Sequence, residues 1–324
     1  MLREIRNPDL YHGSRKKGYF FEGWYFKLAD KDGRHVFAFI PGIYKDKDRS
    51  MSHSFIQVLN GAEVNYRYIR YEEEAFKWEK HSFEIAVSQS MFSAGGMNLD
   101  IESEGLAVKG TVSFSNLVRW RDSLINPGSM GFYNYFTFME CYSQVCAITG
   151  SVSGKLIVND EEICFDGGKV YIEKNWGRSF PQYWIWVQCN SFCNAGAALT
   201  CSAGRVPFLR GSFDGFLVAL AAEGVFYSFT SINKSTLYIE EKNEDVKLFL
   251  ANRKYTLGIE TESRKDSYVT CMGPNGQGML PLVDECLTGR VQVELRKAQN
   301  GDIIFKDSGV CTGIEYGGKR MFKN

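Results

Sequence analysis

A glutamate among aromatic residues is the first group with chemical potential, in the segment FFEGWYFKL at Phe20–Leu28. An extended strand alternates its side chains between two faces, so Glu22 shares a face with Trp24 and Phe26. A carboxyl group among aromatic rings loses hydration, which raises its pKa and lets it donate a proton near neutral pH. The simpler interpretation is a structural Glu22 paired with a lysine or arginine, and on these residues alone we favour it.

A second polar group lies in the segment YIEKNWGR. Period-two alternation puts Tyr171, Glu173 and Asn175 on one face of a strand. Lys174 and Trp176 then lie on the other face. A carboxyl group beside a phenol and an amide could donate a proton through a hydrogen-bond relay. The same residues could equally form a buried network that fixes the junction between two domains.

The strand predicted over Tyr183–Phe192 has no face that is typical of a protein surface. One face carries ordinary core residues, namely Ile185, Val187 and Cys189. The other mixes aromatic rings with amides, namely Trp184, Trp186, Gln188, Asn190 and Phe192. Apolar walls with a few polar groups are typical of a small-molecule cavity. A strand buried on both sides, whose amides bind neighbouring backbone, fits the pattern equally well.

The familiar catalytic and metal-binding motifs are missing from the sequence. TGSVSGKL at Thr149–Leu156 lacks the spacing and the hydroxyl residue of a phosphate-binding loop, and no G-x-S-x-G segment occurs. Cys189, Cys193 and Cys201 match no zinc-ligand spacing, so we expect no metal site. Of the four histidines, His53 in SHSFIQVL is the candidate for a ligand contact, although a hydrogen-bonded structural histidine is the simpler interpretation.

These residues must be positioned by β-strands, because helical periodicity is almost absent. Short runs that alternate by two recur from end to end, separated by turn signals such as Asp32-Gly33, Asn60-Gly61 and Asn300-Gly301. More than a dozen strands spaced in this way predict an all-β fold of sandwiches or barrels. The best candidate for a helix is the short segment Glu72–Lys80.

Composition narrows the possible partners of this 324-residue chain. Its 38 basic residues are matched by 38 acidic ones, so it lacks the positive surplus of a nucleic-acid-binding protein. The aromatic content of 15% suits β-strands and apolar pockets. The most apolar stretch, Phe216–Phe229, is interrupted by Glu223 and Gly224, so we expect no membrane span. Transient contact with a membrane surface is the closest association with lipid that we expect.

Cysteine usage and the N-terminus predict where the protein works. Nine cysteines are an odd number in a chain too long to need disulfides, and no signal peptide opens the sequence. We therefore expect free thiols in a reducing cytoplasm.

Two segments indicate the domain organisation. YFFEGWYFKL and YIEKNWGRSFPQYWIWVQ combine aromatic, glycine and acidic residues in a similar way, and each could open a barrel. We expect two β domains, residues 1–170 and 171–324.

Segments along almost the whole chain resemble, in order, the tocopherol cyclase-like family. They are FFEGWYFKL, SHSFIQVL, FMECYS, GKLIVNDEEICFDGGKVYIEKNWGRSFPQYWIWVQCNSF, GSFDGFLVAL and TGIEYGG. The most specific part is EKNWG followed by FP and a WxWVQCN strand. The sequence is more similar to compact bacterial members than to the plant enzymes.

The resemblance implies two lipocalin-like antiparallel barrels that are packed together and enclose an apolar ligand. For the plant enzymes it implies cofactor-free closure of a prenylated hydroquinone to a chromanol. Such chemistry requires an acid that protonates the prenyl double bond, aromatic faces that favour the tertiary cation, and a polar group that accepts the phenol proton. The expected partner is thus an apolar small molecule, and no cofactor is expected.

The resemblance gives candidate roles to residues of this chain. Glu22 or Glu173 is the candidate acid. The group that binds the phenol is Tyr171, Asn175 or Gln188. Expected substrate-binding residues are Trp24, Tyr25, His53, Trp176, Trp184, Trp186, Gln188 and Asn190. The alternative is a non-catalytic carrier of an apolar molecule, since barrels of this type often only bind. A third possibility is a protein whose pocket has shrunk and which serves as an interaction surface.

Overall fold

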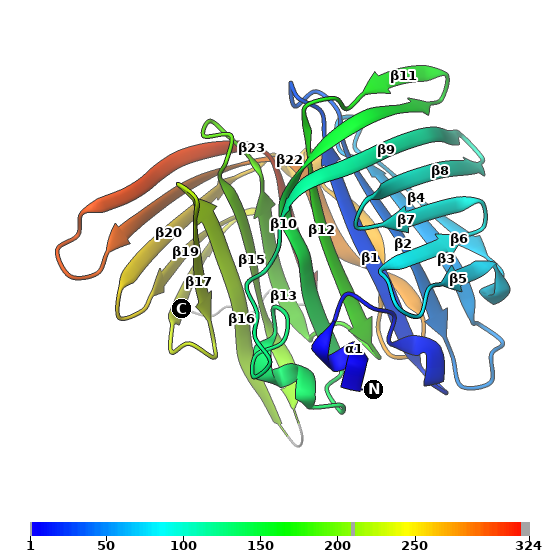
Figure 1. Cartoon of the computed structure of the whole chain (residues 1–324), viewed down its shortest axis with the longest axis horizontal. Coiled ribbons are helices and arrows are strands. Elements are labelled where there is room, and N and C mark those ends of the chain that lie inside the picture. Colours follow the sequence, from blue (N-terminus) through cyan, green and yellow to red (C-terminus); the bar gives the residue numbers. More distant parts are fainter. Residues whose placement is uncertain (1, 209–210, 319–324) are drawn as a thin grey trace. The chain divides into compact units, whose positions relative to one another are not determined.

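The computed structural model describes residues 2–208 and 211–318, and most of these form β-strands in two antiparallel sheets (Figure 1). The predicted all-β class is confirmed. The chain divides into two compact units. Unit 1 comprises Met1–Phe180 and Cys271–Pro281, and unit 2 comprises Pro181–Thr270 and Leu282–Asn324. The boundary expected between residues 170 and 171 falls inside a strand of unit 1.

The sheet of unit 1 has twelve strands. Their order across the sheet is β4 (Asn65–Tyr71), β3 (His53–Asn60), β2 (Val36–Lys45), β1 (Phe20–Ala29), β12 (Gly168–Gly177), β10 (Cys141–Val158), β9 (Leu106–Val118), β8 (Gly96–Ser103), β7 (Ser90–Ser93), β6 (Glu84–Val87) and β5 (Phe76–Trp78), with β11 (Glu161–Cys164) beside β10. Helix α1 (Leu2–Arg6) and the 3-10 turns η1 (Gly13–Arg15), η2 (Glu73–Ala75) and η3 (Gly131–Tyr135) are its helical elements among the described residues.

The interior of unit 1 is aromatic because alternate residues of its strands turn inward. The ring centre of Phe26 on β1 lies 5.6 Å from that of Phe92 and 6.2 Å from that of Phe114. Strands β9 and β10 approach closely at two glycines. A Cβ at Gly110 would lie 2.5 Å from the Lys155 carbonyl oxygen, and one at Gly154 would lie 2.4 Å from that of Thr111. Only glycine allows this approach.

A segment from late in the chain completes unit 1. The backbone N–H of Met272 donates to Tyr66 Oη (2.8 Å), and the N–H of Phe180 donates to the Pro274 carbonyl (3.0 Å). An isolated bridge also joins Ser179 to Asn275. Residues 271–281 thus belong to the first unit although most of the sequence around them belongs to the second.

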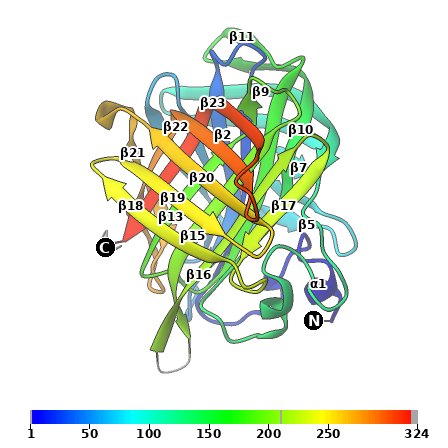
Figure 2. The same cartoon turned by 90° about the vertical axis from the view of Figure 1, so that its left-hand side faces the viewer.

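The sheet of unit 2 has eleven strands, several of which lie side by side in Figure 2. Their order is β17 (Val225–Thr230), β16 (Gly211–Ala222), β15 (Ala198–Phe208), β13 (Tyr183–Cys189), β23 (Ile303–Gly318), β22 (Met279–Lys297), β20 (Tyr255–Glu262), β19 (Asp245–Ala251) and β18 (Thr236–Lys242). The short strand β14 (Ser191–Phe192) pairs with β23, and β21 (Val269–Pro274) pairs with β22. The 3-10 turn η4 (Lys265–Ser267) precedes β21. One face of this sheet forms an apolar core that includes Ile185, Val187, Leu199, Val218 and Ile314.

Two local predictions are wrong. The segment Glu72–Lys80 forms the turn η2 and the short strand β5 instead of a helix, because Phe76 packs against the rings of Tyr11 and Trp24. Phe192 does not share the face of Trp184, since it belongs to the apolar core of unit 2. The strand is interrupted before β14, near Cys311, whose φ is +51°.

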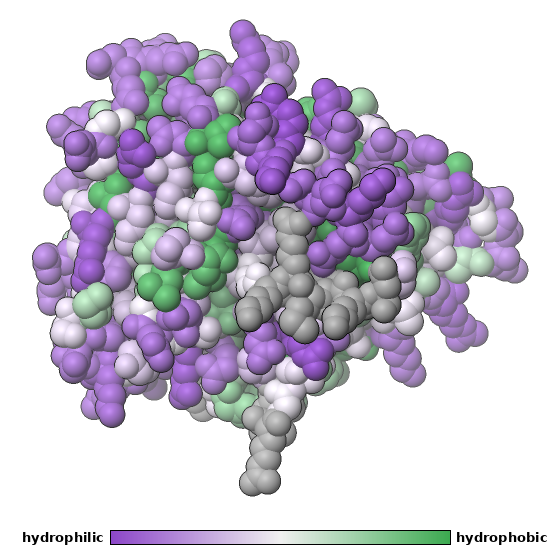
Figure 3. All heavy atoms as spheres, turned by 180° about the vertical axis from the view of Figure 1, so that it is seen from behind, coloured by the Kyte–Doolittle hydropathy of each residue, from purple (hydrophilic) through white to green (hydrophobic). Residues whose placement is uncertain are grey.

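Figure 3 shows one face of the molecule, where hydrophilic side chains predominate and apolar ones are scattered. Within the described ranges, no helix is long and apolar enough to cross a membrane.

Candidate active site

Glu22 is the most deeply buried carboxylate of unit 1, and a lysine neutralises it. Strands β1 and β12 pair so that Glu22 lies opposite Trp176 and Trp24 lies opposite Lys174. Lys174 Nζ is 2.5 Å from Glu22 Oε1, and both side chains are fully buried. The backbone N–H of His12 donates to Glu22 Oε2 (2.8 Å). The carboxylate is thus held by the Lys174 ammonium group, by one peptide N–H and by the His12 ring.

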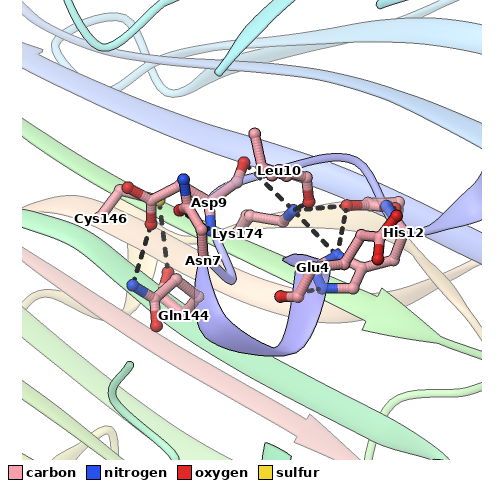
Figure 4. A network of polar contacts seen from close by, with 9 residues as sticks. Glu4, Asn7, Asp9, Leu10, His12, Gln144, Cys146 and Lys174 are labelled. Carbon is pink, nitrogen blue, oxygen red and sulfur yellow. Dashed lines mark hydrogen bonds and ion pairs between the residues drawn. The ribbon is translucent and has the colours of Figure 1, made fainter. Parts of the chain in front are cut away.

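The N-terminal segment surrounds the ammonium group from the other side (Figure 4). Lys174 Nζ donates to the Leu10 carbonyl (2.6 Å) and lies 3.3 Å from His12 Nδ1. His12 Nε2 is 3.3 Å from the Glu4 carbonyl oxygen. His12 Nδ1 also lies 3.2 Å from Glu22 Oε1. The neutral imidazole can bind these neighbours in two ways: with its proton on Nε2 it donates to Glu4 and accepts from Lys174, and with its proton on Nδ1 it donates to Glu22. Burial and the nearby Lys174 charge lower the pKa of His12 below 6.5, which favours this neutral form.

The acid chemistry expected of Glu22 is not supported by its surroundings. Burial raises the pKa of Glu22, but Lys174 and His12 outweigh that effect and bring the pKa below its ordinary value of 4.5. Of the two interpretations of Glu22, the structural pair with a basic residue is confirmed, and the raised pKa is wrong. The reason is Lys174, which pairing of β1 with β12 brings beside Glu22.

Two of the indoles that were expected to bind substrate, Trp24 and Trp176, face a cation of the protein itself. Lys174 Nζ lies 4.8 Å from the ring centre of Trp24 and 5.0 Å from that of Trp176. Trp176 is stacked between His12, at 4.1 Å between ring centres, and Tyr142, at 5.2 Å. Indole faces stabilise a nearby ammonium group. Trp24 and Trp176 thus belong with Glu22 and Lys174, on the face of β12 opposite to Glu173.

The other face of β12 carries a second buried carboxylate, Glu173, and the buried Lys27 of β1 lies opposite Tyr171 on the same face. Tyr171 Oη donates to Glu173 Oε2 (2.5 Å). Ser143 Oγ (2.9 Å) and Asn175 Nδ2 (3.2 Å) donate to Oε1. Glu173 is only 5% exposed, and the ring of Tyr25 lies edge-on to Tyr171 at 6.4 Å between centres. A proton could move between the phenol and the carboxylate along this short hydrogen bond.

The structure brings together Tyr25, Tyr171, Glu173 and Asn175, all named from the sequence. Sequence reasoning missed Ser143, which lies in the FMECYS segment and pairs with Asn175 across β10 and β12. The signal that could have found it is the serine three residues after Glu140, which directly precedes the strand.

His53 on β3 is held at both ring nitrogens. Nδ1 is 2.6 Å from the Met51 carbonyl oxygen, and Nε2 is 2.5 Å from Tyr68 Oη. Its ring also contacts those of Tyr44 and Phe55. Burial lowers the pKa of His53 below 6.5, so the neutral ring donates to Met51 and accepts from Tyr68. This is the arrangement of a hydrogen-bonded structural histidine.

In unit 2, two indoles flank a glutamate that the sequence analysis did not name. Trp184 Nε1 donates to Glu315 Oε1, and Trp186 lies opposite Glu315 across β13 and β23. A Cβ at Gly317 would lie 1.9 Å from the Trp184 ring, and one at Gly313 would lie 2.5 Å from the Trp186 ring. The glycines on either side of Glu315 therefore make room for both indoles. The Gly-x-Glu-x-Gly spacing in TGIEYGG is the signal that could have found it.

The same face of unit 2 buries further polar groups. Glu285 on β22 is 1% exposed and pairs with Glu315 across the sheet, and Gln188 is fully buried. Asn190, 3% exposed, follows the end of β13. Burying carboxylates and amides costs free energy unless they are hydrogen-bonded or paired. One face of this sheet is thus an apolar core and the other an aromatic and acidic surface, although no metal-binding group of three or more His, Cys, Asp or Glu exists among the described residues.

Solved structures with a similar fold cover nearly all of the chain. CghA with Sch210972 superposes with a TM-score of 0.54 at 9% identity, covering 93% of this chain and 89% of that one. An AttH protein from Nitrosomonas europaea gives a TM-score of 0.52 at 13% identity, covering 95% and 94%. Kievitone hydratase from Nectria haematococca gives 0.51 at 9% identity, covering 95% and 92%. These similarities confirm the predicted fold of lipocalin-like antiparallel sheets.

Sequence comparison identifies the family. A probable chloroplastic tocopherol cyclase from Oryza sativa subsp. japonica is 21% identical over 99% of this chain and 80% of its own length. The chloroplastic tocopherol cyclase from Zea mays is 20% identical over 99% and 79%. The family signature described as tocopherol cyclase-like matches residues 107–318, about two thirds of the sequence. The chain therefore belongs to the tocopherol cyclase-like family, as the sequence motifs predicted.

Proposed function

We propose that this protein closes a ring on a prenylated hydroquinone or a related apolar isoprenoid, without a cofactor. Family membership and the plant relatives named as cyclases support an enzyme of the cyclase type. The carboxyl group of Glu173 is the proposed acid. The observation that carries this choice is the hydrogen bond from Tyr171 Oη to Glu173 Oε2, which joins the buried carboxyl group to a phenol that can relay a proton.

The proposed reaction is an isomerisation in which protons and electrons balance. Glu173 in its protonated form transfers a proton to the prenyl double bond, whose π electrons form the new C–H bond. The phenol oxygen then attacks the tertiary cation to form the C–O bond. The phenol proton returns to the carboxylate, which restores the acid. Tyr171 and Asn175 orient the carboxyl group through their hydrogen bonds.

The other predicted contacts remain part of the proposal. Tyr25, Trp184, Trp186, Gln188 and Asn190 are proposed substrate-binding residues, because each is buried in an aromatic or amide-rich setting. Trp24 and Trp176 are less suited to this role, since they face Lys174. His53 is also less suited, because its ring nitrogens are occupied.

Replacing Glu173 with Gln tests the proposed acid. Gln keeps the shape and the hydrogen bonds but has no transferable proton. We expect kcat with a prenylated hydroquinone to fall by about a hundred- to ten-thousand-fold, with little change in substrate binding. Glu102→Gln, on the exposed face of β8, is the matched control and should leave the rate unchanged. An undiminished rate in Glu173→Gln would assign the acid elsewhere, and wild-type binding without any conversion would favour a carrier.

The proposed setting follows from substrate and composition. An isoprenoid substrate partitions into bilayers, so we include transient contact with a membrane surface. A reducing cytoplasm is the proposed location, because the chain has nine cysteines, of which seven are buried as free thiols.

A further inference from the structure

The long connection between β9 and β10, residues 119–140, exposes apolar side chains. Leu124 and Ile125 are each 76% exposed, the highest values among the large apolar side chains of the described residues. Phe138 is 55% exposed and Tyr135 is 41% exposed. Loops of this length are uncommon in compact domains and usually functional. Exposed apolar clusters on soluble proteins commonly mark interaction surfaces.

Leu124 and Ile125 occupy the centre of a tight turn. The N–H of Ser123 donates to the Asn126 carbonyl (3.0 Å), and the N–H of Asn126 donates to Ser123 Oγ (3.1 Å). Turn centres are usually glycine, proline, asparagine or aspartate, whose conformations suit them. The backbone conformation of the turn therefore does not explain why two branched aliphatic residues lie at its centre. They place apolar side chains at the tip.

The tip is held rigidly by the rest of the loop. Tyr135 Oη donates to the Leu124 carbonyl, and the N–H of Gly128 donates to Asp122 Oδ2 (3.1 Å). The buried Asn134 Nδ2 donates to the Pro127 carbonyl (2.6 Å). A segment that is ordered before it binds loses less conformational entropy on binding. The loop thus presents Leu124 and Ile125 in a fixed position.

Cationic side chains precede the tip. Arg119 and Arg121 are both exposed, and Arg119 Nη1 lies 2.8 Å from Asp9 Oδ2. The Asp122 carboxylate accepts a backbone N–H of the loop. Long arginine side chains can reach lipid phosphates while an adjacent apolar tip lies deeper in the interface. This combination of charge and apolar tip fits an anionic bilayer surface.

We propose that the Ser123–Asn126 turn docks the protein on a lipid bilayer that contains anionic lipids. Leu124 and Ile125 enter the interfacial region, and Arg121 binds headgroup phosphate. The inference rests on the proposed function, because an isoprenoid substrate would be taken from that bilayer.

Vesicle flotation tests the docking turn. Vesicles of phosphatidylcholine and phosphatidylglycerol are mixed with wild type or with the double variant Leu124→Ser/Ile125→Ser. We expect the variant to lose about tenfold or more in vesicle partitioning, because it removes the two exposed aliphatic side chains that enter the bilayer in the proposed docking. Tyr238→Ser/Phe249→Ser is the matched control, since these exposed residues face each other on β18 and β19 of unit 2 and should leave partitioning unchanged. Arg121→Gln should weaken partitioning on anionic vesicles and leave it unchanged on pure phosphatidylcholine.

Several results would overturn the docking turn. They are no vesicle binding by wild type, equal binding by the Leu124→Ser/Ile125→Ser variant, or a wild-type dimer that this variant abolishes. The last result would assign the turn to a second copy of the chain. Conversion of detergent-solubilised substrate is measured separately. Conversion without vesicle binding leaves the proposed function intact, and vesicle binding without conversion leaves only the docking turn.

Discussion

Two buried glutamates on opposite faces of the β1 and β12 pair have carboxylates that are stabilised by different partners. Glu22 is fully buried and its carboxylate lies 2.5 Å from the ammonium group of Lys174. Glu173 is 5% exposed and accepts hydrogen bonds from the hydroxyls of Tyr171 and Ser143 and from the amide of Asn175. Both solutions provide the partners that a buried carboxylate needs.

The different partners of the two glutamates affect which of them can donate a proton. A lysine stabilises the ionised carboxylate strongly, and such a group is a poor proton donor. Hydroxyl and amide groups can bind either protonation state, because a hydroxyl rotates to donate or accept. We therefore assign a structural role to the face with Glu22 and the proposed proton transfer to the face with Glu173, where the buried Lys27 also lies.

Removing the lysine should have the largest effect on folding. Lys174→Met leaves the Glu22 carboxylate buried without its counter-charge, which should lower the free energy of unfolding by about 3–5 kcal/mol. Urea denaturation measures this. The double variant Glu22→Gln/Lys174→Met should recover much of the loss, because neither charge then remains buried. If the single and double variants are equally unstable, the ion pair is not the cause.

Low pH should lower the free energy of unfolding through the face that carries Glu22, where His12 also lies. The pKa values of Glu22 and His12 lie below 4.5 and 6.5 in the folded protein, so the unfolded chain binds more protons as the pH falls through these values. The contribution of these two groups to the free energy of unfolding is therefore fully present above pH 6.5. It decreases as the pH falls, first because His12 binds a proton and then because Glu22 does. Urea denaturation at a series of pH values measures this loss. Glu22→Gln should reduce the slope below pH 4.5, to which Glu4 and Asp46 also contribute because their pKa values are lowered, and an unchanged slope would contradict this assignment.

Replacing the other glutamate should affect folding least. Glu173→Gln keeps one acceptor oxygen, and the hydroxyls of Tyr171 and Ser143 can rotate to accept from the new amide. We expect the free energy of unfolding to fall by about 1 kcal/mol. The same urea measurement checks it. A loss as large as that of Lys174→Met would show that Glu173 is also chiefly structural, and the contrast between the two faces would fail.

Strand alternation predicted which side chains share a face, but not which strands lie side by side. The grouping of Tyr171, Glu173 and Asn175 needs only the period of a single strand, and the sequence contains that period. The partner of Glu22 depends on β1 pairing with β12, which is far from it in the sequence. Pairing of Glu22 with a basic residue was therefore the favoured interpretation, but the sequence could not identify Lys174 as its partner.

Local breaks in strand alternation are the other reason why the sequence did not predict every neighbour correctly. Alternation through Asn190 puts Phe192 with the tryptophans, but the strand ends at Cys189 and Phe192 enters the core. Glu315 was missed because its aromatic neighbours belong to another strand. The glycines beside it leave no side chain of their own to indicate what they accommodate.

The path of the chain through unit 1 has a consequence for attempts to divide the protein. Because residues 271–281 bind Tyr66 and the backbone near Ser179 and Phe180, a fragment that stops at residue 180 lacks these partners. The remaining fragment would carry residues 271–281, which belong to unit 1, without the rest of that unit. A single cut in the gene therefore separates residues 271–281 from the rest of unit 1 and yields two incomplete halves.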